Sequence, residues 1–294
     1  MKGFSGSIVA RPVFDLVLKR DASGIVRGSG SMAAYIEVSD LVIAVTGRTV
    51  PAMPNGIVVM QQHGLQAFQS GSPVEIDRDG IRSADVRVSL IRPRVWDPLV
   101  PQWANSAGEL LDTAREMWWR LRLARTVEPL EMVDRLARGG YATASEVDGR
   151  VGLELLFRSV GECDPEHARR AAALLLGRGP GLTPEGDDFL AAALAALRAC
   201  ERSTGWTHEE VGAWRSAVLP DDLRKRTTAL SATLLEFAER GYVSEPVQTL
   251  FDVGAPFEEW LRELNRLKRV GHGTGRAWAA GCAATTILLT CDAA

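Results

Sequence analysis

The sequence lacks the patterns of several common site types. Four cysteines occur in 294 residues and none forms a CxxC pair, and the four histidines show no metal-ligand spacing. Neither a disulfide framework nor a zinc site is therefore predicted. We expect the cysteines to be buried, reduced thiols of a cytoplasmic protein; they are Cys163, Cys200, Cys282 and Cys291.

Signals for export, membranes and nucleic acids are also missing. Residues 1–11 hold no apolar core segment of the kind that signal peptides have. The longest apolar stretch, residues 277–289, is too short and too rich in small side chains to span a bilayer. The net charge is −3 and the basic residues are scattered, whereas nucleic-acid surfaces concentrate them. We therefore expect a cytoplasmic location and neither a membrane nor a nucleic-acid partner.

Familiar catalytic loops are missing as well. No serine or cysteine lies in a nucleophile elbow, and no GxGxxG or Walker-type loop follows a strand. The apolar content of 46% and the charged content of 24% are ordinary for a globular protein. The candidate chemistry must therefore be sought in less common motifs.

The pattern of the chain changes near residue 100. Up to Trp96, short β-branched runs recur between turn signals at spacings of about ten residues. Pro93, Pro98 and Pro101 mark a boundary, and helical periodicity follows. We predict an α+β fold with a β-rich domain in residues 1–100, which forms a small β-barrel or sandwich. A larger all-α bundle of eight to ten helices follows in residues 101–294.

The most informative stretch is residues 177–188, GRGPGLTPEGDD. Its glycines and Pro180 require a turn. Thr183 followed by Pro184 predicts a helix start with a threonine cap. Gly186 stands where a capping box has a glutamate. We therefore expect a helix start whose first backbone amides have no side-chain partner, which suits an anion.

A similar unit recurs near the C-terminus, where residues 271–275, GHGTG, precede a helix of small residues. If the two helices pack in parallel, their starts converge on one polar pocket. The alternative is that both glycine loops are only tight helix connections. The candidate substrate-binding residues in the two loops are Gly179, Gly181, Leu182, Thr183, Gly186, Gly271, Gly273, Thr274, Gly275 and Arg276.

Three residues are candidates for catalysis: Asp187, Asp188 and His272. One carboxylate could orient a substrate amide or hold a Mg²⁺ ion that bridges to a phosphate. Mg²⁺ is the one cofactor considered, and no metal ligand set is assigned. The two aspartates project about 100° apart on a helix, so we expect only one to reach the pocket. The alternatives are that they only complement the helix dipole, and that loop backbone satisfies the His272 ring.

Further candidates are cationic or hydroxylic. Arg276 could grip a carboxylate or phosphate, or be a surface arginine. Arg226, Thr227 and Ser231 are expected on one helix, with Thr227 and Ser231 sharing a face that lines the pocket. The alternative is that these hydroxyls bond back to the backbone.

The segment 179–188 resembles the signature of the AllH family. The segments 54–57, 226–231 and 271–275 fall in the order expected for that family, so the resemblance extends over most of the chain. The second loop departs from the family pattern at Gly273, where a serine or threonine is expected.

The resemblance implies a subunit of oxamate carbamoyltransferase, which acts in ureide catabolism during purine and allantoin degradation. Its reaction converts oxalurate and phosphate into oxamate and carbamoyl phosphate, and two other subunits are required. The expected ligand is a small anion: oxalurate, oxamate, phosphate or carbamoyl phosphate. Two other hypotheses stay open, a non-catalytic scaffold subunit that docks catalytic partners and a stand-alone metal-dependent amide or ureido hydrolase.

Overall fold

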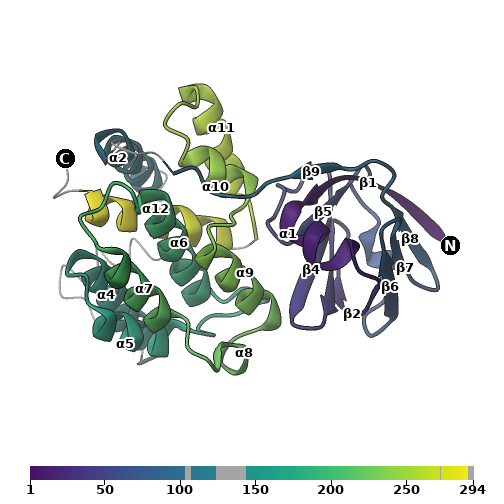
Figure 1. The fold of residues 1–294 in the computed structure, drawn as a ribbon, viewed down its shortest axis with the longest axis horizontal. Coiled ribbons are helices and arrows are strands. Elements are labelled where there is room, and N and C mark those ends of the chain that lie inside the picture. The colour runs from purple at the N-terminus through teal and green to yellow at the C-terminus, as the bar shows by residue number, and fades with distance from the viewer. Residues whose placement is uncertain (103–106, 124–143, 272, 291–294) are drawn as a thin grey trace. The chain divides into compact units, whose positions relative to one another are not determined.

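The structure is a computed structural model that describes residues 1–102, 107–123, 144–271 and 273–290 (Figure 1). The chain divides into two compact units, Met1–Leu99 with Val243–Glu245, and Val100–Tyr242 with Pro246–Ala294. Each unit has its own core.

The first unit is built from nine strands, a short helix and two irregular turns of helix. The strands are β1 (Lys2–Ala10), β2 (Ala22–Ser29), β3 (Ala33–Val38), β4 (Leu41–Gly47), β5 (Gly56–Val59), β6 (Pro73–Asp77), β7 (Gly80–Arg82), β8 (Val86–Ser89) and β9 (Arg94–Trp96). The helical segments are α1 (Arg11–Val13), Phe14–Leu18 and Leu65–Ala67.

These strands form a closed barrel. The order β5-β4-β3-β2-β6-β7-β8-β1 is closed by an antiparallel pairing of β1 with β5, and β9 pairs with the last part of β1. Closure leaves the eight-stranded ring without open edges. The predicted α+β class is confirmed, and the barrel rather than the sandwich is the correct form of the β region.

The barrel core follows from strand alternation. Every second residue of β3 is buried, because side chains on a strand point to alternate faces. Phe68 and Leu65 fill the interior together with apolar residues from all the ring strands. Two residues, Arg78 and Asp79, connect β6 to β7 in a hairpin.

The remaining described residues form ten helices. They are α2 (Ala107–Leu123), α4 (Ala144–Gly161), α5 (Pro165–Leu175), α6 (Glu185–Cys200), α7 (His208–Val218), α8 (Leu223–Arg226), α9 (Ala229–Glu239), α10 (Glu245–Leu250), α11 (Phe257–Leu267) and α12 (Thr274–Thr290). None of the described helices has both the length and the apolar character needed to cross a membrane.

Local capping signals explain several of these helix starts. Asp164 caps α5 by accepting hydrogen bonds from the amides of Glu166 and His167. Thr207 and Glu210 form a reciprocal capping box at the start of α7. The sequence also has a capping-box pattern that begins at Ser106, which lies outside the described residues.

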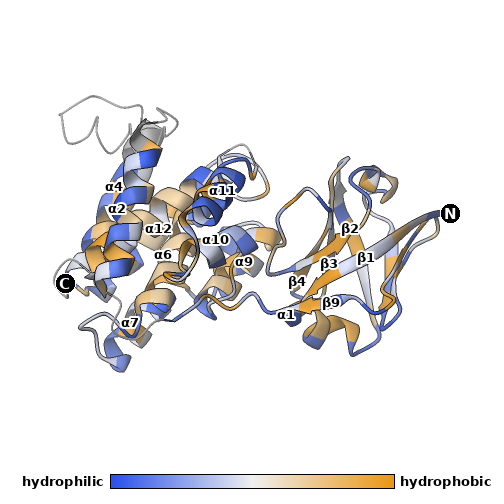
Figure 2. Cartoon of the chain, turned by 90° about the horizontal axis from the view of Figure 1, so that it is seen from above, coloured by the Kyte–Doolittle hydropathy of each residue, from blue (hydrophilic) through white to orange (hydrophobic). Residues whose placement is uncertain are grey.

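The helices α6 and α12 lie at the centre of the helical unit (Figures 1 and 2). Every residue of α6 except Glu185 and Arg198 is buried. The Cys282 thiol lies 3.8 Å from the Ala192 carbonyl oxygen. A Cβ added at Gly281 would lie 2.7 Å from the Ala192 Cβ, closer than carbon atoms normally approach. Small side chains therefore let the two helix backbones pack closely.

The burial predicted for the cysteines is only partly correct. Cys200 and Cys282 are buried free thiols, whereas Cys163 is half-buried at a helix end with a φ of 51°. Burial raises the pKa of the Cys200 thiol to about 12 and that of Cys163 to about 11. Cys291 lies outside the described residues.

The helix predicted through Arg226 and Ser231 is wrong in detail. α8 ends at Arg226, Thr227 is fully extended, and Thr228 caps the separate helix α9. Thr227 and Ser231 therefore do not share a face of one helix. The helix breaks here because the Thr227 hydroxyl donates to Asp187 and the Thr228 hydroxyl donates to the Leu182 carbonyl.

The packing of α6 on α12 predicts the effect of Gly281→Ala. The added methyl group has no room against Ala192, and such overpacking costs about 1–3 kcal/mol. Urea denaturation should show lower stability for this variant. Gly212→Ala in α7 is the matched control, because its Cβ meets open space and alanine favours a helix by ~1 kcal/mol over glycine. Equal stabilisation by both substitutions would contradict the close packing.

Candidate functional site

The loops before α6 and α12 are built on the same plan. In each, a glycine in the first helical turn lies against a backbone carbonyl from the last turn of the preceding helix. A Cβ at Gly186 would lie 2.1 Å from the Leu175 oxygen, and one at Gly275 would lie 1.8 Å from the Leu267 oxygen. Only glycine permits either approach, so both residues have a packing reason to be glycine.

The two loops meet in space. The hydroxyl oxygens of Thr183 and Thr274 lie 2.8 Å apart and share a hydrogen bond. Because both helices start at this point and pack along their length, they run parallel, as predicted. The predicted cap is wrong, since Pro184 occupies the capping position of α6 and no side chain caps it. The Thr183 hydroxyl is turned to the other loop instead.

A third segment, the start of α9, packs against the first of these loops. The Thr228 hydroxyl donates to the Leu182 carbonyl at 2.6 Å and accepts from the Ser231 amide at 3.1 Å. The start of α9 is thereby tied to the first loop. The Ser231 hydroxyl is buried near the Asp187 carboxylate and acts to lower the pKa of that carboxyl group.

Asp187 holds these segments together. One of its carboxyl oxygens accepts from the Gly177 amide at 2.8 Å, and the other accepts from the Thr227 hydroxyl. Burial raises the pKa of Asp187, and the bonds from Thr227 and Gly177 oppose that rise. Since both oxygens are occupied by the protein, Asp187 serves the architecture of the loop.

Asp188 lies in a different environment. Its side chain is 3% exposed and its Oδ2 atom has no hydrogen-bond partner. Burial raises its pKa well above the usual range, and the charge of Asp187 adds to the rise, while Thr274 and Trp278 partly oppose it. Asp188 is thus a buried acid whose raised pKa favours the protonated form, and one of its oxygens has no hydrogen-bond partner.

The helix starts are less bare than the sequence indicated. The Gly186 amide donates to the Arg178 carbonyl, and the Gly275 amide donates to the Val270 carbonyl, both at 3.0 Å. The Arg276 amide likewise donates to the Gly273 carbonyl at 3.0 Å. The preceding loops therefore occupy these amides, and the site offers hydroxyls and a buried acid rather than a row of free N–H groups.

The other candidates surround this centre at different depths. Gly179, Gly181 and Leu182 are exposed, and Arg276 is half-buried in the first turn of α12. The guanidinium of Arg226 forms an exposed ion pair with Asp222 at 2.7 Å. Gly271 and Gly273 lie in the second loop, and His272 lies outside the described residues.

Two participating residues were missed from the sequence, Thr228 and Trp278. Trp278 follows Thr274 by four positions, so the two share a helix face. That spacing could have placed Trp278 beside Asp188. The role of Thr228 depends on the break between α8 and α9, and no local signal predicts which carbonyl its hydroxyl reaches.

The site also bears on the metal hypothesis. Among the described residues, the only cluster of three potential ligands is Glu162, Asp164 and His167 at the start of α5. Asp164 is used there as a helix cap. Asp187 and Asp188 do not converge with a third such side chain from the described part of the chain.

The buried acid predicts a specific pH dependence. Because the folded state holds the Asp188 proton more tightly than the unfolded state, raising the pH from about 4 towards the folded pKa favours unfolding. The slope for one proton reaches about 1.4 kcal/mol per pH unit. Asp188→Asn removes this pH dependence of the free energy of unfolding. The stability of the variant relative to the parent should therefore rise with pH in urea titrations. A difference between variant and parent that stays constant with pH would contradict the buried acid.

The comparisons with known proteins give one match. No curated protein and no solved structure matched the chain. The family described as oxamate carbamoyltransferase subunit AllH matches residues 175–286. The barrel and helices α2 and α4 lie outside this range, so the similarity covers less of the chain than the sequence patterns indicated. The matched range runs from the end of α5 into α12 and contains both loops, so the predicted resemblance to the AllH family is found over residues 175–286.

Proposed function

We propose that the chain is a subunit of an oxamate carbamoyltransferase of ureide catabolism, and that the paired starts of α6 and α12 bind its small carboxylate or carbamoyl substrate. The family match supports the subunit assignment and implies other subunits. The observation that carries the site is the unpartnered Oδ2 of Asp188, beside the hydroxyl pair of Thr183 and Thr274.

A protonated Asp188 removes an electrostatic obstacle. Two ionised carboxylates beside the helix starts would repel an anionic substrate. The raised pKa of Asp188 favours its neutral form, which donates a hydrogen bond where a carboxylate could only accept one. One hydroxyl hydrogen of the Thr183 and Thr274 pair is used between them and the other can be donated, and Arg276 brings positive charge to the first turn of α12. An oxamate carboxylate or a phosphate fits such a set of donors.

The same acid suits the proton transfer of the proposed reaction. A phosphate oxygen forms a bond to the carbamoyl carbon of oxalurate, and the bond from that carbon to the oxamate nitrogen breaks. The leaving nitrogen needs a proton, which Asp188 supplies, and the attacking phosphate returns one to Asp188. The atoms balance without a metal or a redox partner. An acid with a raised pKa is what this step requires.

One observation favours the scaffold hypothesis instead. Gly177, Gly186 and Gly275 are each explained by contact with a backbone carbonyl, so the glycine loops do not by themselves require a ligand. Asp188 separates the two hypotheses, because its Oδ2 atom has no hydrogen-bond partner within the described structure. A scaffold subunit would keep its function without the Asp188 carboxyl proton, whereas a substrate-binding subunit would lose activity.

The activity test is Asp188→Asn in the complex reconstituted with the two other subunits. Loss of a general acid typically lowers kcat by about 10²–10⁴-fold, and we expect a loss in this range from a variant subunit that is folded and assembled into the complex. Asp221→Asn is the exposed control and should keep full activity. Asp187→Asn should instead lower the melting temperature, since it puts an amide donor against the Gly177 amide or the Thr227 hydroxyl. Full activity of Asp188→Asn in a stable complex would support the scaffold.

Ligand binding can be tested on the isolated chain. Thermal unfolding with phosphate, oxamate, oxalurate and carbamoyl phosphate should show a rise for at least one of them. A ligand at about a hundred times its dissociation constant adds ~2.7 kcal/mol of stability. Thr274→Val removes one hydroxyl of the pair and should abolish the rise, whereas Thr249→Val in α10 should not. The absence of any shift with the parent chain would count against the site.

A further inference from the structure

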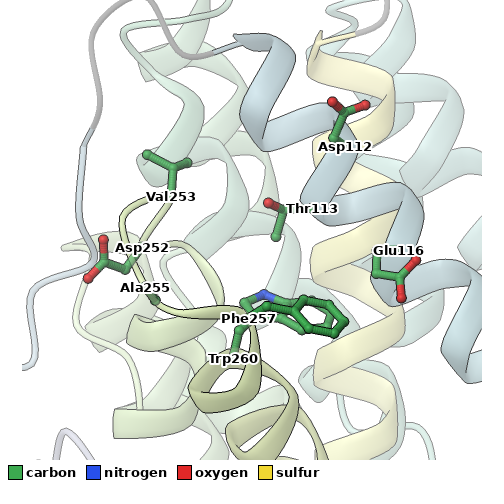
Figure 3. A pocket seen from close by; sticks show the side chains of 8 residues that line it. All are labelled: Asp112, Thr113, Glu116, Asp252, Val253, Ala255, Phe257 and Trp260. Atoms are coloured by element: carbon green, nitrogen blue, oxygen red, sulfur yellow. The ribbon is translucent and has the colours of Figure 1, made fainter.

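A second site lies in the helical unit, away from the two glycine loops. A pocket of about 430 Å³ opens between α2, the loop from α10 to α11, and the first turn of α11 (Figure 3). Its lining is Asp112, Thr113, Glu116, Asp252, Val253, Ala255, Phe257 and Trp260. None of these residues belongs to the site described above.

The charge in this pocket is negative. Asp112 and Asp252 both line it, on different sides (Figure 3), and neither forms an ion pair with another residue that the structure describes, although the Asp252 carboxylate accepts from the Gly254 amide at 3.0 Å. Glu116 is also in the lining, but Arg120 already pairs with it at 2.6 Å. An anion placed here would face repulsion from Asp112 and Asp252, whereas a cation would be attracted by both.

The pocket also contains an unused hydrogen-bond donor. Trp260 is 5% exposed, and its indole nitrogen is buried without a partner. Figure 3 shows this nitrogen on the side of the ring nearest Thr113. A buried donor without an acceptor costs free energy, and an occupant that brings an acceptor would remove that cost.

Phe257 controls access to this donor. Its ring stacks on the Trp260 indole with centroids 6.0 Å apart, and its side chain is 55% exposed. An occupant that reaches the buried indole nitrogen must displace this ring, which the Arg120 guanidinium also contacts at 5.2 Å from the ring centroid. The indole face then offers an apolar surface to the body of that occupant.

We propose that this pocket binds a small organic cation that carries an uncharged carbonyl oxygen. The cationic group lies between Asp112 and Asp252, and the carbonyl accepts from the Trp260 indole. The proposal is independent of the carbamoyltransferase assignment, because the α6 and α12 site calls for an anion and shares no residue with this pocket.

Two related probes test the proposal on the full chain. Arginine amide has a cationic head and a carbonyl, whereas agmatine has the same guanidinium and no carbonyl. In saturation-transfer NMR titrations at low salt, arginine amide should bind about fivefold more tightly than agmatine, the worth of one hydrogen bond. Glutamate, as the anionic probe, should not bind. Equal binding of the first two probes, or no binding of arginine amide, would overturn the proposal.

Variants locate the site. Trp260→Phe keeps an aromatic ring and removes the donor, so it should weaken arginine amide about fivefold and leave agmatine unchanged. Asp252→Asn should weaken both probes, with an effect that shrinks as salt is added. The controls are Trp119→Phe and Asp221→Asn, the same changes at exposed positions outside the pocket. Circular dichroism checks the fold of each variant. Folded Trp260→Phe and Asp252→Asn proteins that bind like the parent would disprove this site.

Discussion

The helical unit depends on the close parallel packing of α6 against α12. Alanine, glycine and cysteine side chains bring the two backbones within reach, as the contact of Cys282 with the Ala192 carbonyl shows. Gly281 gives up about 1 kcal/mol of helix propensity relative to alanine, and the dense contacts along the interface offset it. Because the helices run parallel, their starts lie at one end, and the hydroxyls of Thr183 and Thr274 meet there.

The same packing determines the chemistry of two adjacent acids. Both lie in the first turn of a helix that is buried on nearly all sides, so burial raises the pKa of each. For Asp187 this rise in pKa is partly opposed, because its carboxylate accepts hydrogen bonds from Gly177 and Thr227. Asp188 keeps an oxygen without a partner. Two side chains that are neighbours in the sequence thus differ in use, because they project about 100° apart on the helix.

Much of the architecture could be read from local patterns. The short β-branched runs indicated the barrel strands, the capping box at Thr207 marked the start of α7, and the small residues after Asp188 indicated a buried helix. Errors arose where a tertiary partner outcompeted a local one. Thr183 has the sequence of a cap, yet its hydroxyl bonds to Thr274. Thr227 follows a helical pattern, yet it is extended and bonds to Asp187.

The sequence by itself determined the α+β class, the two glycine loops and the small-residue helices that follow them, because backbone freedom and side-chain periodicity are local properties. Only the tertiary structure decided that the barrel closes through β1 and β5, that loop carbonyls occupy the amides of Gly186 and Gly275, and that Asp188 rather than Asp187 keeps a free oxygen. The reason is physical. Hydrogen-bond partners and burial depend on atoms brought together from distant parts of the chain, and no local pattern specifies which of them arrive.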